Sequence, residues 1–184
     1  MSWPPDRDRY LELGDDARLA EEISARSERR SRLLRASEVA TWVGTLADLV
    51  ERRSPVVVRL AGKRTYRGAP VALGRDHVAV RTPSRQVALL SLSALRSVRP
   101  EPGTAAPPAT GDRERSEGRT LAEIIERCAE ESRRLVLGLD GVDELLTGQV
   151  TALGEDVLTF RVDAEDHGVL YLPVQAVCEL IVDT

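Results

Sequence analysis

The stretch Thr45-Leu-Ala-Asp-Leu-Val-Glu-Arg52 occurs a second time in the chain, as Thr120-Leu-Ala-Glu-Ile-Ile-Glu-Arg127. Two further pairs of blocks match in the same order: Arg67–Asp76 with Thr147–Asp156, and Val87–Leu95 with Val169–Val177. The separation between matching blocks grows in small steps, as insertions in connecting loops would cause. Three collinear matches predict two copies of one structural unit, and the fold follows from that unit.

The repeated unit is a short helix followed by strands. Apolar residues in 39–50 and in 121–128 recur at three-and-four spacing, which predicts an amphipathic helix at the start of each copy. Short β-branched runs follow, and the tripeptides Gly74-Arg75-Asp76 and Gly154-Glu155-Asp156 are typical hairpin signals between two of them. We therefore expect an α+β fold that is mainly β, with five short antiparallel strands in each copy.

A glycine lies inside the second strand of each copy, at Gly68 and at Gly148, and predicts sharp bending. Short, strongly bent strands suit a small closed or nearly closed barrel. The expected architecture is thus two modules, each with a short N-terminal helix and a five-stranded bent antiparallel barrel. A polar helix precedes the first module.

Changes in composition predict the domain boundaries. Residues 1–36 form an N-terminal tail and polar helix, and residues 37–100 form a basic module. Residues 101–118 are rich in Pro, Gly and Ala and predict an extended linker. Residues 119–184 form an acidic module.

The net charge of −4 hides a division of charge between the copies. Residues 45–100 contain eleven Arg and Lys against three Asp and Glu, a net charge of +8. Residues 119–184 contain five Arg against fourteen Asp and Glu, a net charge of −9. Two copies of one scaffold with opposite charge predict different surface roles, although drift of surface charge in an Arg-rich proteome would give the same numbers.

Two binding hypotheses follow from this division. In the first, basic and acidic copies attract each other or another protein. In the second, the basic copy binds nucleic acid through phosphate contacts. The candidate contacts of the basic copy, to nucleic acid or an acidic partner, are Arg59, Lys63, Arg64, Tyr66, Arg67, Arg75, His77, Arg81 and Arg85. The candidate contacts of the acidic copy to a basic partner are Asp140, Asp143, Glu144, Glu155, Asp156, Asp163, Glu165 and Asp166.

The sequence contains no recognisable catalytic motif. We find no Gly-rich phosphate loop, nucleophile elbow or zinc-protease signature, and so predict no catalytic, cofactor-binding or metal-binding residues. Cys128 and Cys178 are expected to be reduced core thiols, with a disulfide between them as the alternative. With no long apolar run, we expect a cytoplasmic protein without a membrane partner.

The segment Leu60–Val78 looks like the first Sm motif, and Val169–Leu180 looks like the second. The chain thus resembles the Sm-like family, which includes Hfq and the LSm proteins, and in particular tandem proteins of this type from actinobacteria. The resemblance implies an Sm-like barrel in each copy, and ring assembly. Hfq-type RNA pockets use a Lys-His pair where this chain has Leu92-Ser93 and Val174-Gln175, and the Arg-Gly of eukaryotic Sm pockets is also missing. Family-type uridine binding is therefore not implied.

The sequence-based interpretation is a non-enzymatic binding protein. Its favoured role is a protein-interaction or assembly module built on oppositely charged tandem barrels, with a protein partner or self-association. The alternative is an RNA- or DNA-binding regulator that acts through the basic first module.

Overall fold

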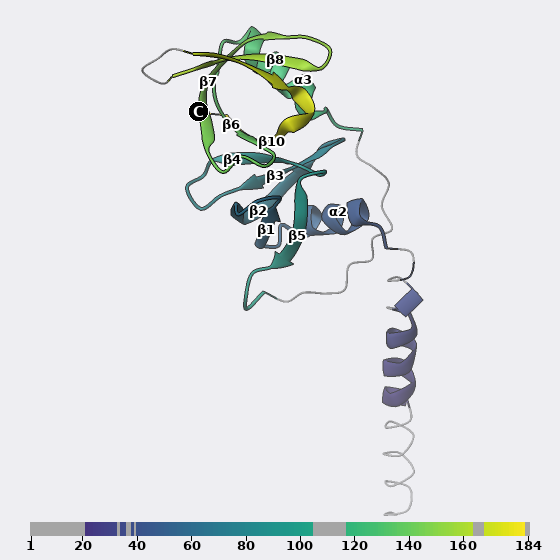
Figure 1. The fold of residues 1–184 in the computed structure, drawn as a ribbon. Coiled ribbons are helices and arrows are strands. Elements are labelled where there is room, and N and C mark those ends of the chain that lie inside the picture. Colours follow the sequence, from purple (N-terminus) through teal and green to yellow (C-terminus); the bar gives the residue numbers. More distant parts are fainter. Residues whose placement is uncertain are drawn as a thin grey trace, which may run out of the picture.

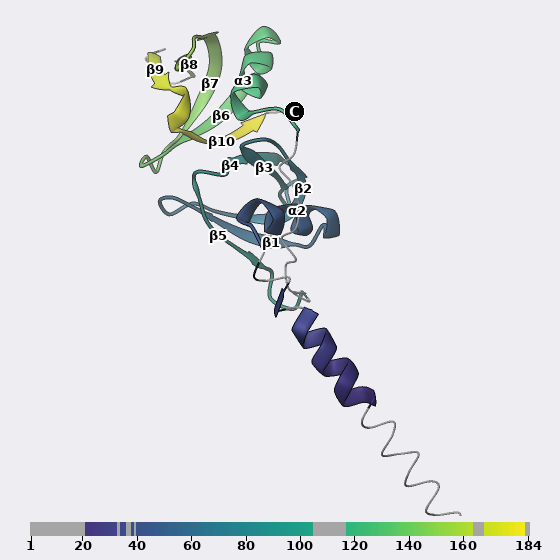
Figure 2. The same ribbon diagram turned by 90° about the vertical axis from the view of Figure 1, so that its right-hand side faces the viewer.

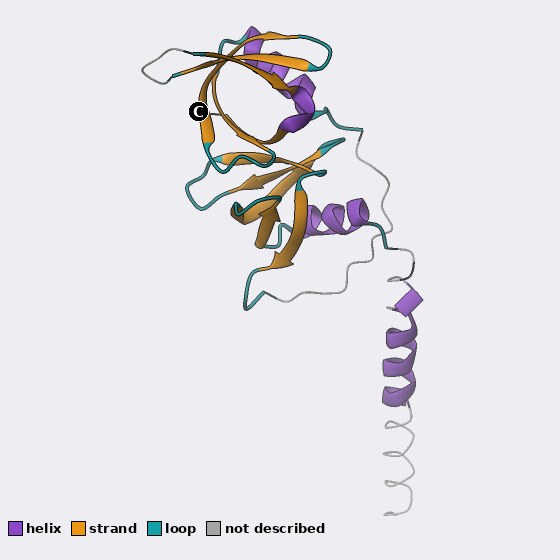
Figure 3. Ribbon diagram, in the orientation of Figure 1, coloured by secondary structure: helices purple, strands orange, loops and turns teal. Residues whose placement is uncertain are grey.

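The computed structural model describes residues 21–32, 34–35, 38, 40–104, 117–163 and 168–182. Residues 21–32 are helical. The remaining elements, shown in Figure 1 and by type in Figure 3, are α2 (Trp42–Arg52), β1 (Val56–Leu60), β2 (Thr65–Leu73), β3 (His77–Arg81), β4 (Val87–Ser91), β5 (Leu95–Pro100), α3 (Leu121–Glu130), β6 (Arg134–Leu139), β7 (Leu145–Leu153), β8 (Val157–Val162), β9 (Val169–Pro173), the 3-10 helix η1 (Val174–Ala176) and β10 (Val177–Val182). Much of the predicted tail and linker, with Glu165 and Asp166, lies outside the described residues, so these domain boundaries stay predictions.

Both predicted helices form, and local side chains cap their N-termini. The Thr41 hydroxyl accepts a hydrogen bond from the Gly44 amide at 3.0 Å at the start of α2. Helix α3 begins with a capping box, in which Thr120 and Glu123 each accept a hydrogen bond from the other's backbone amide. The backbone reverses after α2 at Arg53, which takes a left-handed conformation with φ of 48°.

The strands form one ten-stranded antiparallel sheet with the order β5-β1-β2-β3-β4-β10-β6-β7-β8-β9. The α+β, mainly β class is therefore confirmed. The order contains one pattern twice, since β10-β6-β7-β8-β9 repeats β5-β1-β2-β3-β4. We call β1–β5 with α2 the first half and β6–β10 with α3 the second half. The sheet is strongly curved (Figures 1 and 2) but not closed, because β5 and β9 are its end strands and do not pair.

The register of the strands also repeats. The pairing of β2 with β3 shifts between Pro70 and Ala72, and that of β7 with β8 shifts between Val150 and Ala152. Gly68 and Gly148 lie beside these shifts. A methyl group on either glycine would overlap a carbonyl of the neighbouring strand. Close backbone approach, in addition to bending, therefore explains both glycines.

Each half has its own apolar core. The first contains Leu46, Val58 and Leu90, and the second contains Ile125 and Phe160. Where the halves meet, side chains of each half pack into the core of the other. Leu89 of the first half packs on the second core, whereas Cys178 and Ile181 of the second half pack on the first. Because each half completes the core of the other, the meeting point is part of the fold.

Candidate functional site: the joint between the halves

The two halves are joined by strand pairing between β4 and β10 (Figure 2). Glu179 lies opposite Leu90, and Leu180 lies opposite Leu89. Strand β10 also pairs with β6, so it has a neighbour on each side. We call this pairing, with the side chains around it, the joint.

A buried ion pair crosses the joint. Arg64, in the loop before β2, places Nε 2.9 Å from Oε1 of Glu179, and the Glu179 side chain is completely buried. The Arg64 guanidinium also donates hydrogen bonds at 2.8 Å to the carbonyl oxygens of Leu139 and Val142. The guanidinium of Arg64 in the first half is thus inserted into a binding site formed by the second half.

The pKa values of the joint reflect this burial. Burial raises the pKa of Glu179 above its ordinary value of 4.5, and Tyr66 and Arg64 oppose the rise. Burial and the nearby Glu179 carboxylate raise the pKa of the Tyr66 hydroxyl far above its usual range. Tyr66 is therefore neutral and contributes no charge to the joint.

Gly138 on β6 provides the space for the buried carboxylate. It lies opposite Glu179 across the β6–β10 pairing, and a methyl group at this position would overlap the Glu179 side chain. The corresponding pair in the first half is Arg59 opposite Ser97, with the long charged side chain on the other strand. The equivalent residue pair thus holds an anion on β10 in the second half and a cation on the other strand, β1, in the first half.

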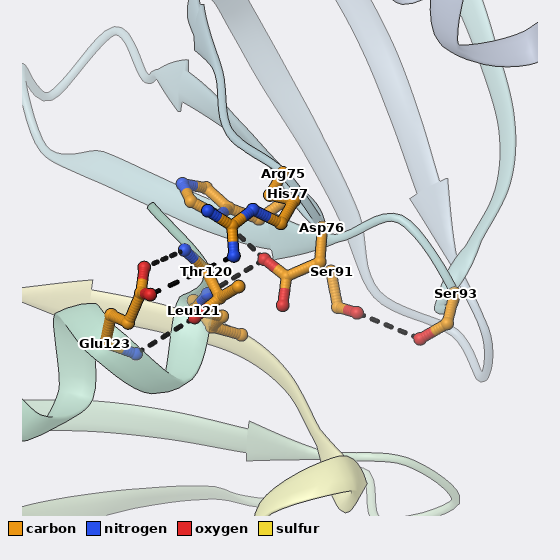
Figure 4. A network of polar contacts seen from close by, with 8 residues as sticks. All are labelled: Arg75, Asp76, His77, Ser91, Ser93, Thr120, Leu121 and Glu123. Carbon is orange, nitrogen blue, oxygen red and sulfur yellow. Dashed lines mark hydrogen bonds and ion pairs between the residues drawn. The ribbon is translucent and has the colours of Figure 1, made fainter. Parts of the chain in front are cut away.

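A second network joins the halves at the start of α3 (Figure 4). The Asp76 carboxylate accepts a hydrogen bond from the Leu121 backbone amide at 2.8 Å and lies 3.1 Å from Nδ1 of His77. Arg75 lies beside Glu123 at 4.0 Å, and its backbone amide donates to the carbonyl of Arg119. Asp76 from the first half therefore caps a helix of the second half.

The structure divides the basic candidates into two groups. Arg64, Tyr66, Arg75 and His77 lie at the joint, where Arg64 and Arg75 contact carboxylates of the second half. The His77 ring is buried and packs against Gly74. The remaining candidates are exposed: Arg59, Lys63, Arg67, Arg81 and Arg85.

The acidic candidates are spread over the second half. Asp143 lies near Gly62 at the joint, and Asp163 forms an ion pair with Arg134 at 2.6 Å. Glu155 and Asp156 line a cleft between the halves together with Arg75 and Asp76. Asp140 and Glu144 are exposed.

Glu179 and Asp76 each make a polar contact between the two halves, and neither was among the candidate residues predicted from the sequence. The sequence contains a signal for Glu179, since it is the one charged residue within the apolar run Val177-Cys-Glu-Leu-Ile-Val182. A charge in a strand that is buried on both faces requires a partner. Asp76 gave no such signal because it reads as an ordinary turn residue.

No protein-family model, curated protein or solved structure matches this chain. Within the described residues, no helix is long and apolar enough to cross a membrane. The same residues contain no cluster of three or more His, Cys, Asp or Glu side chains that could hold a metal ion. Cys128 and Cys178 are both free and buried.

Proposed function

We propose that the protein is a non-enzymatic assembly module of two Sm-like units. Identical chains would associate head to tail, with β9 of one chain pairing with β5 of the next. The observation that carries the proposal is the open edge at β9. Val169, Leu170 and Tyr171 are exposed there, Tyr171 to 74%. The corresponding strand of the first half, β4, is covered by β10. An uncovered apolar edge strand favours pairing with another strand.

The joint serves as the template for this contact. In the repeated strand order β9 corresponds to β4, and β5 corresponds to β10. Applying the register of the joint places Leu172 of one chain opposite Ser97 of the next, and Tyr171 opposite Val98. The contact joins different surfaces of identical chains, so it builds a ring or a filament.

The distribution of charge supports the same head-to-tail arrangement, with β9 of one chain beside β5 of the next. In the joint, Arg64 enters a binding site beside Glu179. The corresponding site in the first half is a depression lined by Arg59, Leu60, Ala61, Gly62, Arg96 and Ser97. The residue of the second half that corresponds to Arg64 is Glu144, by the repeat that pairs Arg67 with Thr147. The head-to-tail contact would therefore bring Glu144 to the depression that holds Arg59 and Arg96, an ion pair of reversed sign whose cation comes from the strand opposite Ser97, the residue equivalent to Glu179.

The test is the molar mass of the full chain by light scattering over a range of concentrations. We expect mass to increase with concentration, and Tyr171→Asp to abolish the increase. Ile23→Asp is the matched control, because Ile23 is an exposed apolar residue outside the sheet. A wild-type chain that stays monomeric at every concentration would overturn the proposal.

A charge swap tests the polarity. Glu144→Arg and Arg59→Glu are each expected to weaken association, whereas an equimolar mixture of the two variants restores it. In the mixture the two variants can alternate, so that every contact again joins side chains of opposite charge. If the mixture associates no better than either variant alone, the proposed ion pair between Glu144 and Arg59 is wrong. This holds even if Tyr171→Asp has abolished association in the first test.

A second candidate function is nucleic-acid binding, which one observation favours. Arg67 and Arg99 flank Val57 in one cross-strand row, and Arg59 follows on the same face of β1. None of these three arginines forms an ion pair within the described residues. Binding of labelled single-stranded RNA and DNA by the full chain at low and high salt tests this role. No retardation at low salt would exclude it.

A further inference from the structure

A pocket of about 360 Å³ lies between β4 of the first half and α3 of the second. Its floor is apolar and consists of Val87, Leu89, Ile124, Cys128 and Val182. Both halves contribute to it, so the pocket exists only when the joint is formed. Its size falls in the range of about 300–1,000 Å³ that is usual for ligand pockets.

The rim of the pocket is strongly basic. It consists of Arg85, Arg119, Arg127, Arg133 and one acidic residue, Glu131. Glu131 is shared between Arg127 at 2.9 Å and Arg133 at 2.6 Å, and their hydrogen bonds lower its pKa. In the part of the chain that the structure describes, Arg85 and Arg119 have no carboxylate partner. The rim therefore has two guanidinium groups free to bind an anion.

The turn before β4 fixes Arg85 beside the pocket. Arg85 has a left-handed backbone with φ of 69°, an uncommon conformation for a residue with a side chain. Its amide donates to the Thr82 carbonyl at 2.9 Å, and the Thr82 amide donates to the Gln86 carbonyl at 2.9 Å. The Arg85 backbone is thus held by the turn itself, which reduces the cost of ordering this side chain on a ligand.

An apolar floor below a cationic rim selects for one kind of molecule. The floor gains from covering apolar surface, and guanidinium groups bind carboxylate, sulfonate or phosphate oxygens in paired hydrogen bonds. We propose that this pocket binds a small amphiphilic anion, with its charged group at Arg85 and Arg119 and its apolar part over Leu89 and Cys128. The site needs neither open sheet edge, so it is independent of the proposed assembly.

The test uses the full chain with 1-anilinonaphthalene-8-sulfonate as a fluorescent probe and decanoate as the competitor. We expect decanoate to displace the probe. Decylamine, with the same chain length and opposite charge, should not displace it, and neither should inorganic phosphate. Displacement by decylamine would show that the pocket does not select for a negative charge. Displacement by phosphate would show that binding does not need contact with the apolar floor. Either result overturns the proposal.

Variants locate the site. The double variant Arg85→Ala/Arg119→Ala should bind decanoate about tenfold more weakly or worse, because charged hydrogen bonds are lost. Arg29→Ala/Arg30→Ala removes two exposed cations of the helical segment 21–32 that do not line this pocket, and should bind as the wild type does. Equal affinity of the wild type and the Arg85/Arg119 variant overturns the assignment.

The two native thiols give a second readout that needs no variant. Cys128 lies in the pocket floor, whereas Cys178 lies at the joint and contacts Arg64. Decanoate should slow the alkylation of Cys128 by N-ethylmaleimide, measured by peptide mass spectrometry, and leave Cys178 unchanged. Equal slowing of both would indicate a general change in stability and would contradict binding at this pocket.

Discussion

Strands β5 and β10 occupy the same place in the two halves, yet their side chains differ in kind. Strand β10 lies between β4 and β6, and its first four residues are buried. Strand β5 pairs only with β1, and Arg96, Ser97 and Arg99 on it are exposed. Both pair with the first strand of their own half in the same register, with the irregularity in the same place.

The difference shows that the neighbour, and not the scaffold, selects the side chains. Covered on both sides, β10 is apolar except for Glu179, which Arg64 neutralises. At the edge, β5 has arginines and ends in Pro100, features that discourage indiscriminate strand pairing. An acidic partner would be tolerated at such an edge. The predictions below break or sharpen this comparison, beginning with the largest effect.

The largest expected effect is that of Arg64→Ala. This change leaves the Glu179 carboxylate buried without its counter-charge, which typically costs about 3–5 kcal/mol. Urea unfolding monitored by circular dichroism measures the loss. Lys63→Ala is the control, because Lys63 is the exposed neighbouring cation, and its effect should stay within about 0.5 kcal/mol. A loss no larger than that of the control would mean that the ion pair does not stabilise the joint.

The next effect in size is that of Gly138→Ala. The added methyl group overlaps Glu179, and overpacking of this kind costs about 1–3 kcal/mol. Gly168→Ala provides the comparison, since a methyl group there meets nothing within 4 Å. Thermal unfolding of both variants checks the difference. If the two variants unfold together, the space beneath Glu179 is not constrained.

A smaller effect is expected for Asp76→Ala, which removes the carboxylate that accepts from the Leu121 amide at the start of α3 and leaves the Thr120–Glu123 capping box in place. Loss of a helix cap costs about 1 kcal/mol. The matched control is Asp156→Ala, since Asp156 holds the same position in the second half. Its carbonyl accepts from the Val174 amide just after β9, as the Asp76 carbonyl accepts from the Leu92 amide just after β4. Equal stability of the two variants would show that Asp76 does not connect the halves.

The smallest expected effect is a pH dependence that Glu179 imposes. Its pKa is raised in the folded chain, so the folded chain binds this proton more tightly than the unfolded chain does. The contribution of Glu179 to stability is therefore greatest below its ordinary pKa of 4.5, and declines as pH rises through the higher folded value. Relative to Glu179→Gln, the wild type should lose stability over this range in urea titrations. A constant difference between the two proteins at all pH values contradicts the raised pKa.

Much of the fold could be predicted from sequence because it depends on local signals. The helices follow from apolar spacing and caps, and the hairpins follow from Gly74-Arg75-Asp76 and its counterpart. The repeat predicted the equivalence of the halves. How the halves meet could not be predicted in this way, because the pairing of β4 with β10 depends on which strands remain at the edges once each half has folded.

The candidate residues show the same limit. Charge counts identified Arg64 and Arg75 only as candidate contacts to nucleic acid or an acidic partner, and in the structure both lie beside carboxylates of the same chain. Counting could not distinguish them from Arg59 or Arg67, which are exposed. Only the three-dimensional position of a cation decides whether its charge is available to another molecule.

The joint also implies an order of events as the chain folds. Arg64 contacts Cys178 across a separation of 114 residues in the sequence, and contacts between such distant residues form late. Until β10 arrives, Leu89 and the edge of β4 are open to any strand nearby, and open apolar edges lead to aggregation during folding. We therefore expect the yield of refolded protein to depend on how quickly the last strand finds its place, even in variants whose final stability is unchanged.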